Sequence, residues 1–196
     1  MSRLFVLAVI ALALAGCGHR HPFHARDISG LMPDLNFTLT DDSGRTVTAA
    51  DFQGKDVLLF FGYTNCPDYC PATLAHLHQA IKRLPEATRK SIKVLFVSVD
   101  PKRDTPAKLK QYTAYFGPEF MGLTGSLDAL KDLTKRYRTT FSYGKADAQG
   151  NYVVSHGLAV YAFDRRGQVR LMILNDEPVP QLSQDLTQLT QLQPSA

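Results

Sequence analysis

Residues 56–71 read DVLLFFGYTNCPDYCP, and this stretch decides the fold. Its first half is continuously apolar from Val57 to Phe61, which is typical of a strand buried on both faces of a sheet. Its second half carries Cys66 and Cys70, each followed by a proline. The second proline, Pro71, suits the first turn of a helix. The stretch therefore predicts a buried strand that leads through a cysteine-containing loop into a helix.

The rest of the chain alternates strand and helix patterns. Upstream, residues 35–48 alternate apolar and polar side chains around an Asp-Asp-Ser-Gly turn, as in a β-hairpin. Downstream, we expect a helix over 71–84, a strand over 92–99, helices over 106–116 and 127–137, a hairpin over 158–174 and a last helix from about residue 178.

This order of elements predicts the α/β class, with a central mixed sheet covered by helices on both faces and an N-terminal β-hairpin addition. A strand that enters a helix through cysteines is the thioredoxin arrangement, so we expect a thioredoxin-like fold. The chain has 196 residues, enough for one domain with a proper core. The net charge of +4 is spread thinly, without a long basic run, so nucleic acid is not expected as a partner.

The N-terminus has the pattern of an export signal. A positive start at Arg3 precedes an apolar run from Leu4 to Ala15, which is too short to span a bilayer. The run ends in Leu-Ala-Gly-Cys17, which resembles a bacterial lipobox. We expect residues 1–16 to be a lipoprotein signal peptide, Cys17 to be lipidated, residues 17–33 to be a membrane tether and residues 34–196 to be the domain. The domain would then face the periplasm of a bacterial cell envelope; an ordinary signal peptide with a chance cysteine is the alternative.

If Cys17 carries lipid, the remaining cysteines, Cys66 and Cys70, form a disulfide switch, a metal clamp or a structural staple. Placed one helical turn apart, their Cβ atoms would be about 6 Å from each other, against about 3.5–4.5 Å in a disulfide. The pair can oxidise if the loop is flexible, but an ion with metal–sulfur bonds of about 2.3 Å fits the resting gap better. The positive potential of a helix N-terminus is expected to favour thiolates. A five-residue loop makes a poor staple.

A pair of thiolates selects a soft metal such as Cu(I) or Zn and needs a third ligand from elsewhere. His76 and His78 lie inside the expected helix after Cys70, so we interpret both as structural or solvated residues. His156, between a serine and a glycine at a strand entry, is the candidate third ligand. The tether histidines (His19, His21 and His24) are interpreted as part of a solvated linker.

Three motifs in order resemble the Sco/SenC family of thioredoxin-like copper proteins: FGYTNCPDYCP at 61–71, SVDPKRDTP at 98–106 and VSH at 154–156. The resemblance implies that Cys66, Cys70 and His156 bind one copper ion, as Cu(I) or Cu(II). It also implies delivery of that copper to the CuA-bearing subunit of cytochrome c oxidase or to another copper protein. Two positions depart from the family pattern: Asn65 stands where histidine is frequent, and Ser155 where aspartate is frequent. Loss of that aspartate would weaken the orientation of His156.

A second function remains open. Cys66 and Cys70 could be the redox pair of a thiol-disulfide oxidoreductase that keeps a partner's cysteines reduced, with His156 tuning the thiolates. Such an enzyme would work without metal and would survive loss of His156. We expect a metallochaperone more than an enzyme. Asp100 and Asp104, in the second motif, are interpreted as turn and capping residues.

Overall fold

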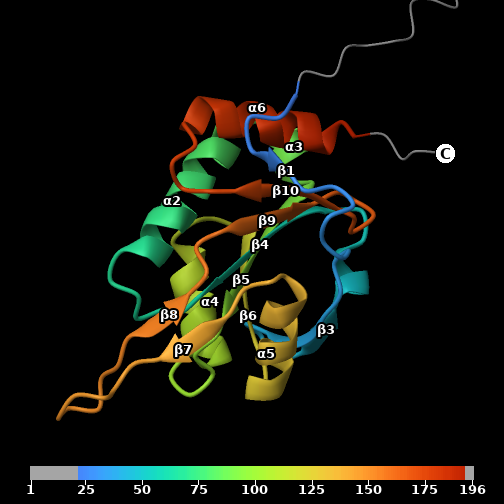
Figure 1. Cartoon of the computed structure of the whole chain (residues 1–196). Coiled ribbons are helices and arrows are strands. Elements are labelled where there is room, and N and C mark those ends of the chain that lie inside the picture. Colours follow the sequence, from blue (N-terminus) through green and yellow to red (C-terminus); the bar gives the residue numbers. More distant parts are fainter. Residues whose placement is uncertain (1–21, 193–196) are drawn as a thin grey trace, which may run out of the picture.

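A computed structural model describes residues 22–192 of the chain (Figure 1). An eight-stranded sheet lies at its centre, in the order β1-β10-β9-β4-β5-β6-β2-β3. The strands of this sheet are β1 (Arg26–Asp27), β2 (Thr38–Asp41), β3 (Thr46–Thr48), β4 (Asp56–Gly62), β5 (Ile92–Ser98), β6 (Phe120–Thr124), β9 (Val160–Phe163) and β10 (Val169–Ile173). The helices are the 3-10 helix η2 (Ala49–Phe52), α2 (Tyr69–Lys82), α3 (Glu86–Arg89), α4 (Pro106–Ala114), α5 (Leu127–Arg136) and α6 (Val179–Thr190).

The apolar run that decides the fold forms β4, and all seven of its residues are buried. Strand β4 pairs in parallel with β5 and antiparallel with β9, so the sheet is mixed, as expected. The predicted hairpins are present as β2–β3 and β9–β10. Thr105 and Ser126, which directly precede the helices expected over 106–116 and 127–137, cap them by accepting hydrogen bonds from Lys108 N and Ala129 N.

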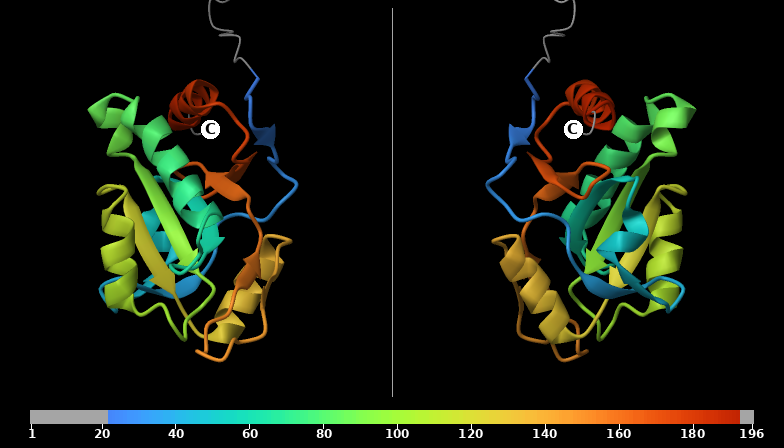
Figure 2. Two further views of the ribbon diagram at one scale, coloured as in Figure 1. Left: turned by 90° about the vertical axis from the view of Figure 1, so that its left-hand side faces the viewer. Right: turned by 90° about the vertical axis from the view of Figure 1, so that its right-hand side faces the viewer.

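Helices cover both faces of the sheet (Figure 2). On one face, the ring of Phe96 in β5 packs 5.2 Å from that of Tyr112 on α4 and 6.2 Å from that of Phe60. On the other face, the ring of Phe61 lies 6.5 Å from that of Tyr137 at the end of α5. Phe60 and Phe61 are neighbours in one strand, and successive side chains of a strand point to opposite faces. The predicted two-sided helical cover is therefore confirmed.

Strand β6 was not expected from the sequence. It pairs in parallel with β5, and its middle residue is Gly122. A Cβ at this glycine would lie 2.6 Å from the Cβ of Leu109, so the glycine lets α4 approach the strand closely. A glycine inside a five-residue run weakens the strand pattern, and this explains why the pattern was overlooked.

The ordered domain begins earlier than the residue 34 boundary expected from the sequence. Within the segment interpreted as tether, Ala25 and Ile28 are buried, and β1 pairs with β10. The backbone N–H groups of His24 and Ala25 both donate to the Asp185 carboxylate on α6. Part of the expected tether is therefore packed against the domain.

The signal peptide expected at residues 1–16, the lipidation site at Cys17 and two tether histidines, His19 and His21, lie outside the described residues, so those predictions stay predictions. Within residues 22–192, none of the helices combines the length and the apolar character that crossing a bilayer requires.

Candidate metal centre

Cys66, Cys70 and His156 come together at the carboxyl end of β4. Cys66 lies in the loop after this strand, Cys70 lies in the first turn of α2, and His156 ends the short strand β8 (Val154–His156). Their ligand atoms all lie within 4.8 Å of one another, and Cys70 Sγ is 3.3 Å from His156 Nε2. One loop residue, one helix residue and a residue 86 positions after Cys70 thus share one site. Their role as metal ligands stays a prediction.

The local geometry of the cysteines differs from the predicted one. Helix α2 begins at Tyr69, two residues before Pro71, so Cys66 precedes the helix and does not share a helical turn with Cys70. The backbone N–H of Cys70 donates to Cys66 Sγ at 3.4 Å. Both cysteines are free thiols in this structure.

The two sulfurs differ in depth. Cys66 is partly exposed, whereas Cys70 is 0% exposed. Burial raises the pKa of the Cys70 thiol, and this outweighs the hydrogen bond that it receives from the backbone of Tyr63. The expectation that the surroundings favour thiolates was therefore wrong for Cys70, because desolvation of a charged sulfur outweighs the potential of the helix N-terminus.

The imidazole of His156 is held in a defined orientation. Its ring meets those of Phe60 and Tyr63 edge-on, each at 5.9 Å. Nδ1 lies 2.9 Å from the carbonyl oxygen of Gly157, which only accepts, so Nδ1 carries the proton and the Nε2 lone pair faces Cys70. Burial lowers the pKa of His156, which favours the neutral ring that a metal ligand needs.

A backbone carbonyl thus does what the aspartate frequent at position 155 was expected to do. Ser155 is exposed and takes no part in holding the ring. Ligating histidines are commonly oriented by backbone carbonyls as well as by carboxylates, so Gly157 can fill this role; the weakening expected from loss of the aspartate stays a prediction.

Two glycines that sequence reasoning missed shape the site. A Cβ at Gly62 would lie 2.8 Å from Cys70 Sγ and 2.5 Å from the ring of Phe96. A Cβ at Gly157 would collide with the side chain of Thr139. A glycine at the end of a buried strand, as at Gly62, is a recognised signal of close approach, and it was available in the sequence.

The other described histidines lie elsewhere, as predicted. His76 Nε2 is buried without a hydrogen-bond partner, and burial lowers the pKa of its ring. His78 packs 6.4 Å from Phe120. Nε2 of His24 lies 3.0 Å from Gln184 Oε1 on α6, so this residue contacts the domain and does not lie free in a linker.

The donor set fits a soft ion. With bonds of about 2.3 Å to sulfur and about 2.0 Å to nitrogen, neighbouring ligand atoms around one ion are about 3.5–4 Å apart. The three donor atoms already lie within 4.8 Å of one another, so small movements would complete such a site. Two sulfurs and an imidazole nitrogen favour Cu(I) or zinc over hard cations.

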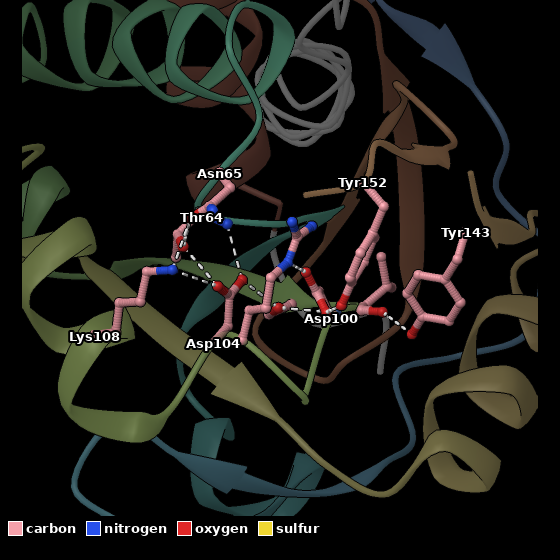
Figure 3. Close-up of polar contacts among 10 residues, drawn as sticks. Thr64, Asn65, Asp100, Asp104, Lys108, Tyr143 and Tyr152 are labelled. Carbon is pink, nitrogen blue, oxygen red and sulfur yellow. Dashed lines mark hydrogen bonds and ion pairs between the residues drawn. The ribbon is translucent and has the colours of Figure 1, made fainter. Parts of the chain in front are cut away.

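Asp104 makes tertiary contacts, and its interpretation as part of a helix cap was wrong (Figure 3). It is 0% exposed and accepts hydrogen bonds from Thr64 N at 2.8 Å, from Thr64 Oγ1 and from Ser98 Oγ at 2.7 Å. Lys108 Nζ lies 3.4 Å from its carboxylate and also donates to Asn65 Oδ1 at 2.7 Å. Asn65, the first departure from the family pattern, thus points to α4.

Asp100 is likewise more than a turn residue. It is 1% exposed, pairs with Arg103 and accepts a hydrogen bond from the hydroxyl of Tyr152 at 2.8 Å. The guanidinium of Arg103 stacks 3.6 Å from the ring centre of the same tyrosine. Because turn formation and helix capping already explained Asp100 and Asp104, there was no reason in the sequence to look for hydrogen-bond partners 52 and 40 residues away.

Comparisons with known proteins agree with this fold. The SCO1/SenC family model matches residues 31–191. The chain is 40% identical over 133 residues to "Protein SCO2 homolog, mitochondrial" of Bos taurus, which covers 67% of this chain and 50% of that protein. It is 40% identical over 134 residues to "Protein SCO2, mitochondrial" of Saccharomyces cerevisiae, covering 67% of this chain and 44% of that one. The chain thus spans about half the length of these relatives.

Two solved structures are similar over most of the domain. The Bradyrhizobium japonicum ScoI structure with copper bound has a TM-score of 0.72 and 31% identity, and covers 80% of this chain and 98% of that one. The yeast Sco1 structure with copper bound has a TM-score of 0.72 and 32% identity, covering 79% and 87%. The thioredoxin-like fold is confirmed. With the family model matching most of the domain and the relatives agreeing in sequence and in structure, this chain belongs to the SCO1/SenC family.

Proposed function

We propose that this protein is a copper chaperone that carries one copper ion as cargo on Cys66, Cys70 and His156. The observation that carries the proposal is the convergence of their three donor atoms within 4.8 Å. It is supported by two relatives, each over 30% identical to this chain, that were solved with copper bound.

The chemistry of the site suits a transferable soft ion. Each thiol gives up its proton when the metal binds, so copper affinity is coupled to pH. The sulfur of Cys66 is partly exposed, which leaves the ion open to ligand exchange with a partner. The neutral, oriented ring of His156 supplies the third ligand without a charge change.

The recipient that we propose is the CuA-bearing subunit of cytochrome c oxidase, and the place is the periplasmic side of a bacterial envelope. Family membership supports the recipient, and the export pattern that ends at Cys17 supports a lipid anchor. A direct test mixes the copper-loaded protein with an apo CuA domain and follows the CuA absorption bands. Bands that do not appear, while a small copper chelator does take the metal, would argue against this recipient.

Copper binding itself is tested by metal analysis and copper titration of the reduced full-length chain in detergent. We expect one copper per chain, and a sharp loss of affinity in Cys66→Ala, Cys70→Ala and His156→Ala. His78→Ala is the matched control, since that ring is also partly buried but lies outside the site. An unchanged affinity in His156→Ala would remove the three-ligand site.

The second candidate is thiol-disulfide exchange, and the different depths of the sulfurs favour it. Cys66 would attack a partner disulfide and release one partner thiol; Cys70 would then attack the mixed disulfide, release the second thiol and leave a Cys66–Cys70 disulfide. The partner gains the two electrons that this chain loses. Reduction of a model disulfide by metal-free protein, at an equal rate in His156→Ala, would favour this enzyme.

A further inference from the structure

The two halves of the metal site belong to segments that do not pair with each other. The cysteines follow β4 in the central sheet, whereas His156 lies in a ribbon of β7 (Phe141–Tyr143) and β8, which pair with one another and not with the central sheet. Figure 1 shows this ribbon extending away from the sheet. The distance between sulfur and imidazole therefore depends on contacts that cross between the two segments.

One short connection, residues 99–105 between β5 and α4, contacts both segments (Figure 3). On the cysteine side, the Asp104 carboxylate accepts hydrogen bonds from the backbone N–H and the hydroxyl of Thr64, two residues before Cys66. It also accepts a hydrogen bond from the hydroxyl of Ser98. These bonds set where the cysteine loop leaves β4.

Toward the histidine, the same connection holds the ribbon at two points. The hydroxyl of Tyr152, four residues before His156, donates to Asp100. The hydroxyl of Tyr143, whose backbone pairs with Val154 in β8, donates to the carbonyl oxygen of Val99 at 2.7 Å. Arg103 lies over the ring of Tyr152 and 5.7 Å from that of Tyr63, which itself packs on His156.

Another buried carboxylate in the chain, that of Asp164, has hydrogen-bond partners only a few residues away in the sequence. Asp164 is 5% exposed and accepts two backbone N–H groups, but both come from Arg166 and Gln168 in its own turn, and its ion pair is to Arg170. Asp164 stabilises a hairpin. Asp100 and Asp104 bind segments 52 and 40 residues away, and both of those segments carry metal ligands.

We propose that Asp104 and Asp100 are positioning residues of the metal site: Asp104 acts on the Cys66 side through Thr64, and Asp100 acts on the His156 side through Tyr152. The inference rests on the proposed copper binding, and extends it from the three ligands to the connection that sets their spacing. Partners that orient metal ligands typically change affinity by about 10–100-fold when they are removed.

The test measures Cu(I) affinity of the full-length chain against competing chelators of graded strength. Asp104→Asn is nearly isosteric but loses a charge and an acceptor, and Tyr152→Phe removes only the hydroxyl and keeps the ring under Arg103. Each is expected to lose about tenfold in affinity. Thr64→Val, a milder change on the same contact, covers the case in which Asp104→Asn folds poorly. Asp164→Asn and Tyr161→Phe are matched controls, the second because the buried hydroxyl of Tyr161 donates to the carbonyl oxygen of Tyr137, and both are expected to leave affinity unchanged.

Double-variant cycles separate positioning from a general loss of stability. The effect of Tyr152→Phe is expected to vanish when His156 is already alanine and to persist when Cys66 is alanine. The effect of Asp104→Asn, or of Thr64→Val, is expected to show the reverse pattern. An equal loss in every background, or an unchanged affinity with a lower free energy of unfolding, would overturn the proposal.

A metal-free measurement keeps the two proposals distinguishable. In the reduced apo-protein, Asp104→Asn is expected to change the alkylation rate of Cys66, and Tyr152→Phe to shift the ring nitrogen resonances of His156; the controls should do neither. If the wild-type chain binds no copper, the proposed function fails while these readouts still decide the positioning roles. If copper binds and neither readout nor the affinity moves, the positioning roles fail alone.

Discussion

Buried carboxylates lie at both ends of the paired strands β4 and β5, but they contact different parts of the molecule. At the carboxyl end, Asp104 accepts hydrogen bonds from the segment that carries the cysteines and Asp100 accepts one from the segment that carries the histidine, beside partners nearer in the chain. At the amino end, within residues 22–192, the Asp56 carboxylate contacts Arg165 Nε at 3.2 Å and Ser91 Oγ at 3.3 Å, and its Oδ1 has no hydrogen-bond partner there. The ends of a seven-residue strand lie about 20 Å apart, so the buried carboxylates at the two ends can be compared as independent cases.

The difference shows that burial of a charge is a poor indicator of function on its own. Burial raises the pKa of Asp56 to about 6, against the opposing effect of Arg165, so this carboxylate is only partly compensated. No ligand-bearing segment touches it. The two carboxylates at the other end are equally buried, and their distinction lies in which segments their donors come from.

The largest effect is expected from substitution of Gly62, at the carboxyl end of β4, and is compared with substitution of Gly54 near the amino end. Gly62→Ala would place a methyl group against Cys70 Sγ and the ring of Phe96, so we expect copper affinity to fall at least tenfold and the free energy of unfolding to fall by about 1–3 kcal/mol. Gly54→Ala, at the amino end, has open space around it but a φ of +81°, which costs about 1–2 kcal/mol in stability. Copper titration and denaturant unfolding of both variants measure the two quantities.

The contrast between the glycines lies in copper affinity, since both substitutions reduce stability. Gly54→Ala should titrate with copper like the wild type. If both variants lose copper affinity in proportion to their stability, the carboxyl end of the strand has no special influence on the site.

The next effect concerns the pH dependence of stability at the amino end. Because the pKa of Asp56 is raised to about 6, its contribution is fully present below about pH 4 and is lost as the pH rises through 6. The free energy of unfolding should therefore fall by roughly 3 kcal/mol from this group between pH 4 and pH 7. Asp56→Asn should remove that slope in urea unfolding series and leave copper affinity intact. A variant with the wild-type slope would assign the titration to another group.

A smaller effect of opposite sign is expected at Asp41, in the β2–β3 turn. Burial alone would raise its pKa, but hydrogen bonds from Ser43 and Arg45 outweigh burial and lower it to about 2. The stabilisation is thus present above about pH 4 and is lost as the pH falls through 2. Unfolding of Asp41→Asn should differ from the wild type at pH 5 and converge with it at pH 2. A gap that stays constant would show that the charge of Asp41 is not what stabilises the turn.

Much of this architecture was readable from the sequence because its signals are local. The apolar run of β4 predicted a buried strand, and Thr105 and Ser126 are residue types typical of helix starts. The spacing of Cys66 and Cys70 predicted two neighbouring sulfurs, but not that Cys66 precedes the helix. His156 was a reasonable candidate because a two-sulfur site lacks a ligand, and few histidines were free to supply it.

The rest depends on contacts between distant segments. The pairing of Phe141 with His156 in the β7–β8 ribbon could not be predicted, because the surrounding sequence is polar and has no clear strand pattern. The charged strand Arg26–Asp27 forms because it pairs with β10 at the edge of the sheet, and its own sequence does not indicate a strand. Asp104 follows a strand and precedes a capping threonine, so local rules already accounted for it. Its partner Thr64, 40 residues earlier, appears only in the fold.

In the copper transfer that we propose, the unequal depth of the two sulfurs would impose a direction on the exchange. An incoming thiolate or imidazole would meet the ion from the side of Cys66, because Cys70 offers no surface to solvent. The bond to Cys66 would then be the first to be exchanged and the bond to Cys70 the last. A recipient would need only one ligand able to reach past Cys66 to begin taking the ion, while Cys70 would retain it until the exchange is nearly complete.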